Sequence, residues 1–168
     1  MHNIIIREAT VSDAAACMDY LRKVGSETDN LSFGEGGFPI SLEGEKEFIE
    51  MMHESPRSVF YVAVRDDEVV GTVRLNGLPR RMRHRAELGI TVLKSEWGKG
   101  LGNRLMETVI DYARGSGIEI VELAVRSDNE RAIRLYEKHG FKEFGVYKSY
   151  FKIDKKYIDF KLMNLYLT

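Results

Sequence analysis

The sequence predicts an α/β protein built on a mixed β-sheet with helices on both faces. Residues 86–113 contain an apolar strand, a glycine-rich turn and an amphipathic helix. A second apolar strand follows at 118–125, and two parallel strands joined through a helix need a crossover connection. Strand pairs with short polar turns lie earlier and at the end, which indicates antiparallel hairpins. Together these features predict a sheet of seven strands and four flanking helices.

The first elements are a short β-branched strand near 4–8 and a helix over 14–24, preceded by capping hydroxyls and an acidic residue. Cys17 lies on the apolar face of that helix, so we expect a core residue rather than a nucleophile. An irregular stretch, 25–41, leads to a second helix at 43–55. Glycines mixed with phenylalanines in a long loop are typical of functional loops.

That irregular stretch also carries Glu27, Asp29 and Glu35. Acidic side chains beside a site would favour a cationic ligand, and a solvated acidic loop is the alternative explanation. After the second helix, a hairpin is predicted from strands at 58–65 and 68–76. The loop after it is rich in arginine; we expect a solvated loop, with aid to an anionic ligand as the alternative.

The central stretch is a strand, a tight turn and a helix. An alternating pattern predicts a largely buried strand: Leu88, Ile90 and Val92 alternate with Gly89, Thr91 and Leu93. Gly98, Gly100 and Gly102 follow, and the apolar spacing from Leu101 to Ala113 is helical. The free N–H groups of a helix N-terminus form an anion site. The glycine spacing fits neither a Walker A loop nor a dinucleotide fingerprint.

The last elements are a strand, a helix and a hairpin. Continuous apolar character over 118–125 predicts burial on both faces. Ser127 and Glu130 match a capping box, and the helix that follows is expected to end at His139-Gly140. Aromatic strands are predicted at 144–151 and 157–167.

Composition sets broad limits on the class of protein. A length of 168 residues predicts one domain, residues 1–168, and 43% hydrophobic with 30% charged residues is ordinary for a globular protein. A net charge of −1 gives no case for nucleic-acid or membrane binding. The single cysteine excludes an internal disulfide and a cysteine-based metal cluster. Without a signal peptide or a long apolar run, we expect a cytoplasmic protein.

Two segments together resemble the GCN5-related N-acetyltransferase (GNAT) family. Trp97-Gly98-Lys99-Gly100-Leu101-Gly102 is similar to the family's pyrophosphate loop, written Gln/Arg-x-x-Gly-x-Gly/Ala. Residues 129–141 resemble its Asn…Ala…Leu-Tyr…Gly-Phe segment, and Ile6 to Asp13 resemble its first strand and helix start. Trp97 departs from the usual Gln or Arg, which puts a side-chain phosphate contact in doubt but not the loop.

The resemblance implies the fold of that family and acetyl-CoA as co-substrate, with no metal. The pyrophosphate would lie on the loop, and the pantetheine arm would pair with the strand before it. The implied acetyl-CoA-binding residues are Ile90, Val92, Leu93, Trp97, Gly98, Lys99, Gly100, Leu101, Gly102, Asn103, Asn129 and Tyr136. Asn129 would hydrogen-bond the pantetheine arm, and its alternative role is a helix cap.

The resemblance also implies two catalytic residues. Tyr136 matches the family's tyrosine general acid, which would protonate the departing thiolate; its alternative is a core tyrosine. Glu87 matches the position of a basic carboxylate in several family members, and its alternative is an exposed strand-end glutamate. A base is needed because a free alkylamine, with a pKa near ~10.4, is mostly protonated at neutral pH.

These residues predict an N-acetyltransferase that acts by direct attack in a ternary complex. The expected acceptor is a primary amine on a small molecule, with a protein N-terminus or lysine as the alternative. The acidic loop favours a cationic amine such as a polyamine or aminoglycoside. A non-catalytic acyl-CoA-binding or regulatory module on the same fold is the alternative. Nucleic-acid binding through the arginine loop ranks last, and the exposed terminal strands allow a homodimer.

Overall fold

A computed structural model describes residues 3–167. Its strands form one mixed seven-stranded sheet in the order β1-β2-β3-β4-β5-β7-β6. Within the described residues the strands are β1 (Ile5–Glu8), β2 (Val59–Arg65), β3 (Glu68–Gly77), β4 (Arg85–Val92), β5 (Ile120–Arg126), β6 (Lys142–Ile153) and β7 (Lys156–Tyr166). The α-helices are α1 (Ala14–Glu27), α2 (Leu42–Glu54), α3 (Leu101–Gly115) and α4 (Glu130–Lys138). This confirms the predicted mixed sheet and its flanking helices.

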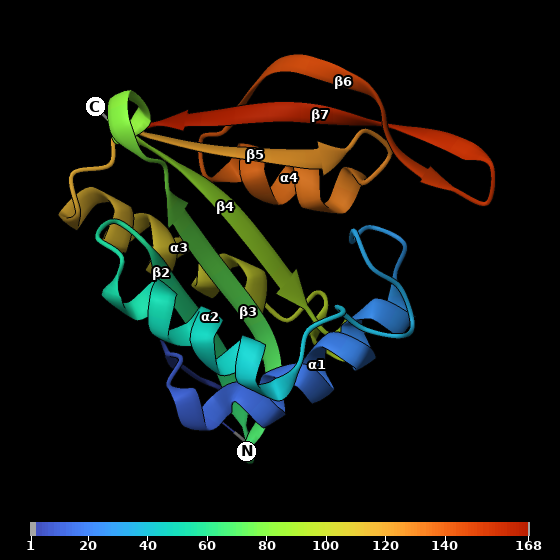
Figure 1. Cartoon of the computed structure of the whole chain (residues 1–168). Helices are drawn as coiled ribbons and strands as arrows, with labels where there is room; N and C mark the ends of the chain where they lie inside the picture. Colours follow the sequence, from blue (N-terminus) through green and yellow to red (C-terminus); the bar gives the residue numbers. More distant parts are fainter. Residues whose placement is uncertain (1–2, 168) are drawn as a thin grey trace.

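Three short 3₁₀ turns complete the described chain: η1 (Val11–Asp13), η2 (Arg80–Met82) and η3 (Lys94–Glu96). Figure 1 shows α1 and α2 on one face of the sheet and α3 on the other. Neighbouring residues of β3 confirm the two layers, because alternate side chains point to opposite faces. Gly71 packs against Leu101 and Leu105 of α3, whereas Thr72 shares a hydrogen-bonded chain with Tyr20 of α1.

The core lies between the sheet and these helices. The face of α3 that was predicted from its spacing is buried: Leu101, Leu105, Met106, Val109, Ile110 and Ala113. Cys17 is also buried, at 1% exposure, and burial raises the pKa of its thiol to about 12. A thiol with that pKa stays protonated at neutral pH, which confirms a core residue rather than a nucleophile.

β4 and β5 separate soon after they begin to pair. Their parallel register covers only Arg85↔Ile120, Ala86↔Val121 and Glu87↔Glu122. Beyond Glu87, β4 keeps β3 as its partner, while β5 continues along β7. The two strands diverge visibly in Figure 1, so the sheet opens in its middle.

This opening corrects two sequence-based expectations. Leu88, Ile90 and Val92 are half-buried rather than buried, because the other edge of β4 has no partner strand there. β5 is buried on one face only, through Val121, Leu123 and Val125, while Ala124 on its other face is exposed. The apolar runs were identified correctly, and their exposure follows from the divergence of the strands.

The start of α4 differs from the predicted capping box. The N-cap is Asn129, whose side-chain Oδ1 accepts a hydrogen bond from the Ala132 N–H at 3.3 Å. Ser127 lies two residues earlier, and its N–H donates to the carbonyl of Asp159 at 2.9 Å. The prediction that Ser127 caps the helix was therefore wrong. Asn and Ser are about equally good N-cap residues, so the sequence did not distinguish Ser127 from Asn129.

Candidate active site

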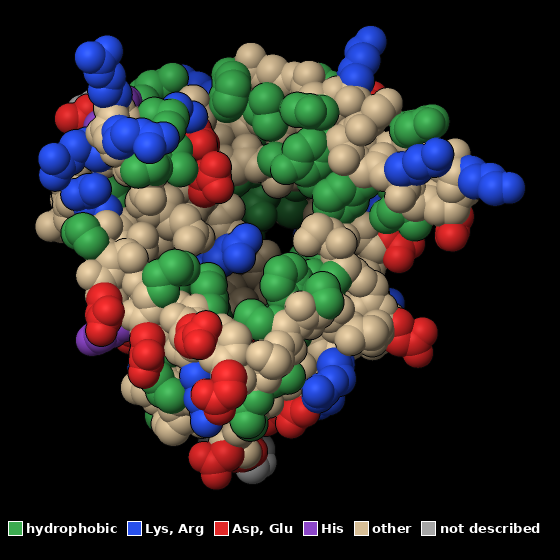
Figure 2. Space-filling view, viewed as in Figure 1, with side chains coloured by type: hydrophobic (Ala, Val, Ile, Leu, Met, Phe, Trp, Pro, Cys, Tyr) green, Lys and Arg blue, Asp and Glu red, His purple; other side chains and the backbone are tan. Residues whose placement is uncertain are grey.

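A large cavity, about 1470 Å³ in volume, lies where β4 and β5 separate. Its walls come from the central strands β3, β4 and β5, from α1, α2 and the loop between them, from the N-terminal part of α3, and from α4. Aromatic residues of β2, β6 and β7 complete the lining. Figure 2 shows the hollow from one side, bordered by apolar and basic side chains. A volume of this size is sufficient for two reactants side by side.

The glycine loop lies at the floor of the opening, before α3. Gly98 and Gly100 have positive φ values of 75° and 88°, which L side chains rarely adopt. Gly100 is the N-cap of α3. The first hydrogen bond of the helix runs from the Arg104 N–H to the Gly100 carbonyl, at 3.2 Å. The N–H groups at 101–103 have no acceptor one turn earlier within the helix. They are therefore available to an anion.

Trp97 holds this loop to the end of β4. Its indole Nε1 donates to the Val92 carbonyl at 3.0 Å. The Arg131 guanidinium of α4 lies over the indole ring, 4.7 Å from the centroid, and its Nη2 approaches the space beside Gly98. Trp97 thus positions the loop through its indole, and Arg131 brings a positive charge beside it. Arg131 was not identified from the sequence, because a surface arginine on a helix is unremarkable until the helix is placed.

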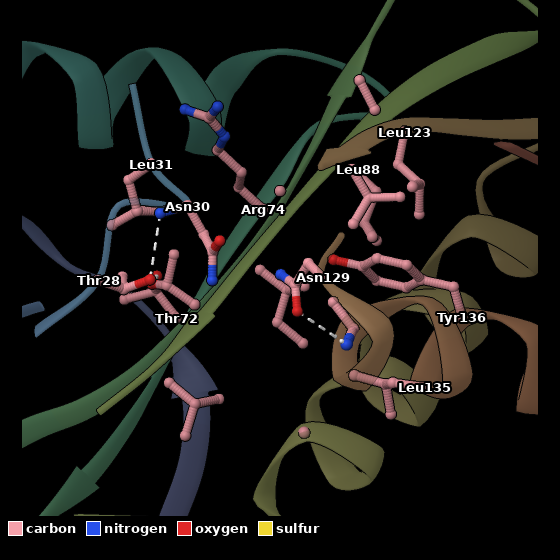
Figure 3. A pocket seen from close by; sticks show the side chains of 18 of the residues that line it. Thr28, Asn30, Leu31, Thr72, Arg74, Leu88, Leu123, Asn129, Leu135 and Tyr136 are labelled. Atoms are coloured by element: carbon pink, nitrogen blue, oxygen red, sulfur yellow. Dashed lines mark hydrogen bonds between the residues drawn. The ribbon is translucent and has the colours of Figure 1, made fainter. Parts of the chain in front are cut away.

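Two polar groups of α4 face the cavity from the other wall (Figure 3). Tyr136 is only 8% exposed and its hydroxyl points into the cavity. No other described residue hydrogen-bonds this hydroxyl, and burial raises its pKa. Tyr136 is therefore a protonated donor with an unused O–H at neutral pH. The Oδ1 atom of Asn129 accepts the helix-capping hydrogen bond, and its side-chain amide N–H groups have no partner among the described residues.

The carboxylates near the opening differ in their partners. Glu87 and Glu122 occupy paired positions at the last point where β4 and β5 are in register. Glu122 forms an ion pair with Arg85, whereas no described residue forms an ion pair or a side-chain hydrogen bond with Glu87. Glu87 is exposed and lines the cavity, so its carboxylate is not committed to another side chain.

A second unpaired carboxylate, missed in the sequence, belongs to Glu45 of α2. The residue is 4% exposed, lines the cavity, and has no described hydrogen-bonding or cationic partner for its carboxylate. Burial raises its pKa. It lies one turn from Phe48, whose ring contacts that of Phe60 of β2 at 5.6 Å between centroids. The helical spacing gave Glu45 no distinguishing signal beside the other glutamates of α2.

Most of the acetyl-CoA-binding residues expected from the sequence line this one cavity. The structure brings together Glu87, Ile90, Val92, Trp97, Gly98, Gly100, Leu101, Gly102, Asn103, Asn129 and Tyr136. Two of the expected residues, Leu93 and Lys99, are not among its lining. Leu93 is 4% exposed in the core and its N–H donates to the Val70 carbonyl at 3.0 Å. Lys99 is exposed.

The acidic residues expected beside the site lie outside the cavity lining: Glu27 at the end of α1, and Asp29 and Glu35 in the α1–α2 loop. A Glu27 carboxylate oxygen accepts from the Lys94 backbone N–H at 2.8 Å, and the Asp29 carbonyl accepts from Arg126 at 3.1 Å. Glu35 is exposed on the loop. The lean toward a cationic acceptor therefore has no support from these residues. The neutral Thr28, Asn30 and Leu31 of the same segment face the cavity instead (Figure 3).

The sheet thus opens between β4 and β5, with a glycine loop and an unbonded tyrosine hydroxyl at the opening, and comparison with known proteins identifies the family. The model of the acetyltransferase (GNAT) family matches residues 26–141. The chain therefore belongs to this family and is an N-acetyltransferase by descent.

Individual relatives agree with that assignment. The L-amino acid N-acetyltransferase AaaT of Escherichia coli is 34% identical, with 95% of both chains covered. A GNAT-family acetyltransferase from Streptococcus pneumoniae superposes with a TM-score of 0.95 at 32% identity, covering 98% of this chain and 100% of that one. The yncA protein of Salmonella typhimurium, solved with its cofactor acetyl-CoA, shares the fold at 22% identity and a TM-score of 0.85, covering 98% and 94%.

No helix among residues 3–167 is long and apolar enough to cross a membrane.

Proposed function

We propose that the protein transfers the acetyl group of acetyl-CoA to a primary amine of a small molecule, by direct attack within a ternary complex. The observation that carries the proposal is the unbonded Tyr136 hydroxyl facing the point where β4 and β5 separate. The volume of the cavity and the name of the Escherichia coli relative, an L-amino acid N-acetyltransferase, support a small acceptor.

Acetyl-CoA supplies the acetyl group as a thioester and carries a pyrophosphate. The N–H groups at 101–103 and the Arg131 guanidinium suit that pyrophosphate. The unpaired edge of β4 beyond Glu87 exposes backbone groups that can pair with the amides of an extended arm, and the free amide of Asn129 lies beside that edge. These residues would hold the thioester at the opening.

The reaction then needs three proton transfers. Glu87 takes a proton from the acceptor ammonium, directly or through water, and the free amine nitrogen attacks the thioester carbonyl carbon. The carbon–sulfur bond breaks, and the Tyr136 hydroxyl donates its proton to the departing sulfur. The nitrogen of the new amide gives up its remaining extra proton, which returns to the Tyr136 oxygen directly or through water. Much of the rate comes from aligning the reactants, since effective molarities reach ~10⁵ M or more.

Thiol release from acetyl-CoA across a panel of primary amines, secondary amines and alcohols tests the function. We expect release only with primary amines, and initial-rate lines that intersect when both substrates are varied. Asn129→Ala should raise the KM for acetyl-CoA. Stoichiometric transfer of a radiolabelled acetyl group to the protein itself, before acceptor is added, would contradict direct attack. Tight CoA binding without turnover on any amine would instead establish the non-catalytic module.

The assignment of the base has its own control within the cavity. Glu45→Gln removes the other unpaired carboxylate and leaves Glu87 in place. We expect Glu87→Gln to lower kcat by about 10²-fold, the lower end of general-base effects, and Glu45→Gln to change it much less. A larger loss in Glu45→Gln than in Glu87→Gln would transfer the role of base to α2.

A further inference from the structure

An unpaired cation lies in the acceptor part of the cavity. Arg74 of β3 lines the cavity, and no described residue forms an ion pair or a side-chain hydrogen bond with its guanidinium. In contrast, the nearby Arg85 and Arg126 are each paired with an acidic side chain, Glu122 and Asp128. A free guanidinium in a ligand cavity has five donors for a planar anion.

The backbone provides a path for this side chain. Arg74 is in register with Gly89 of β4 on the same face of the sheet. A Cβ at Gly89 would come within 2.7 Å of Arg74 Nε and 3.3 Å of its Cγ. The arginine side chain therefore lies over the glycine, within the cavity. A side chain of any size at position 89 would block this path.

The position of Arg74 also relates it to the base. Asn76 is in register with Glu87, so Arg74 and Glu87 are diagonal neighbours on one face of the β3–β4 pair. Such neighbours are about 7–8 Å apart along the sheet. Each has a free charge of opposite sign, and they form no ion pair with each other. This spacing suits a ligand whose ammonium and carboxylate are carried on one carbon.

The remaining wall of the acceptor part is apolar. Phe33 and Phe38 of the α1–α2 loop meet edge to face, with centroids 5.7 Å apart, and both line the cavity together with Phe48 and Phe60. An acceptor with an apolar side chain could bury it there.

We propose that Arg74 binds the carboxylate of the acceptor, and that the acceptor is an α-amino acid with an apolar side chain. This inference rests on the proposed function and names the substrate class of the same site. In this arrangement the guanidinium of Arg74 binds the carboxylate of the acceptor, and the amine nitrogen of the acceptor lies near Glu87. This reverses the expectation of a cationic amine, because a second positive charge on the acceptor would be repelled by the guanidinium of Arg74.

The test compares each common L-amino acid that is turned over with the amine formed by removing its carboxyl group, for example L-leucine with 3-methylbutylamine. For Arg74→Gln, kcat/KM should fall about 10- to 100-fold for the amino acid, the range expected from losing a hydrogen bond to a charged group, and change little for the amine. Each ratio compares variant with wild type on one acceptor, so the differing basicity of the two amines cancels.

Two further variants separate recognition from general effects. Gly89→Ala should reproduce the selective loss on the amino acid, because the arginine must move while its charge remains. Arg81→Gln removes an equal charge from η2, outside the cavity lining, and should leave both acceptors unaffected. Isothermal titration should give an unchanged Kd for CoA in all three variants.

The outcomes distinguish this inference from the proposed function. Turnover of amines with equal losses on both acceptors in Arg74→Gln, or preference for amines lacking a carboxylate, would overturn the role of Arg74 and leave the N-acetyltransferase intact. Absence of turnover on every amine, with CoA still bound, would overturn the proposed function and this inference with it.

Discussion

Replacing Tyr136 by phenylalanine removes one hydroxyl and nothing else from the cavity wall. No described residue hydrogen-bonds that hydroxyl, and the ring packs against Phe141 with centroids 5.9 Å apart. Phenylalanine keeps this packing, so the free energy of unfolding should change by no more than about 0.5 kcal/mol. Any large effect of the substitution must then arise during the reaction.

General-acid catalysis contributes roughly 10²- to 10⁴-fold to a rate. A thiol has a pKa near ~8.5, so its thiolate is a fair leaving group and the lower end of that range applies. We expect kcat for Tyr136→Phe to fall about 10²-fold, equivalent to about 2.7 kcal/mol. Because burial raises the pKa of the phenol, the wild-type enzyme should keep its general acid through neutral and mildly basic pH.

The assay is thiol release at saturating acetyl-CoA and acceptor, with thermal unfolding and the Kd for CoA measured on the same preparation. The matched control is Tyr20→Phe, which removes a buried hydroxyl hydrogen-bonded to Thr91 at 2.7 Å on the α1 side of the sheet. Tyr20→Phe should lower stability and leave kcat largely unchanged. A kcat for Tyr136→Phe within twofold of wild type would refute the role of Tyr136 as the acid.

Three further predictions follow from other contacts. Arg131→Met removes the cation beside Gly98 and should raise the Kd for acetyl-CoA about 10-fold. It should also make that Kd less dependent on salt, which titration at two ionic strengths would measure. An unchanged Kd would contradict a phosphate-binding role for Arg131. Glu87→Gln should lower kcat and leave the Kd for CoA unchanged, and a Kd weakened as much as kcat would assign Glu87 to binding instead of proton transfer. The Arg7 guanidinium beside Asp13 lowers the pKa of that carboxyl, so the pair stabilises the fold above the ordinary aspartate pKa, and this stabilisation is lost as the pH falls below about 4. Asp13→Asn should therefore lower the free energy of unfolding by about 1 kcal/mol at pH 7. An unfolding free energy equal to that of the wild type at this pH would count against the pair.

The order of the elements could be predicted because each carries a local signal. The helical spacing of α3, the alternation in β2 and β3, and the glycine after α4 depend on neighbouring residues only. The binding loop could be predicted for the same reason: positive φ at Gly98 and Gly100 is a property of the local backbone. These parts of the sequence needed no knowledge of distant contacts.

The exposure of residues and the acceptor side of the cavity could not be predicted in this way. Half-burial of Ile90 depends on β5 leaving β4, and no periodicity records where two strands part. The alternation in β3 does place Arg74 on one face with Thr72 and Asn76, but whether that face meets solvent or a cavity depends on α1, α2 and their loop. Glu45 and Arg131 could not be identified as cavity residues from the sequence, because their positions depend on how α2 and α4 pack.

A crystal structure of the protein with CoA and an amino-acid acceptor would test the binding site and the role of Tyr136 together. We predict the pyrophosphate on the N–H groups at 101–103, the pantetheine arm along the unpaired edge of β4, and the CoA sulfur within hydrogen-bonding distance of Tyr136. CoA bound outside the opening between β4 and β5, or a sulfur that Tyr136 cannot reach, would contradict the proposed mechanism.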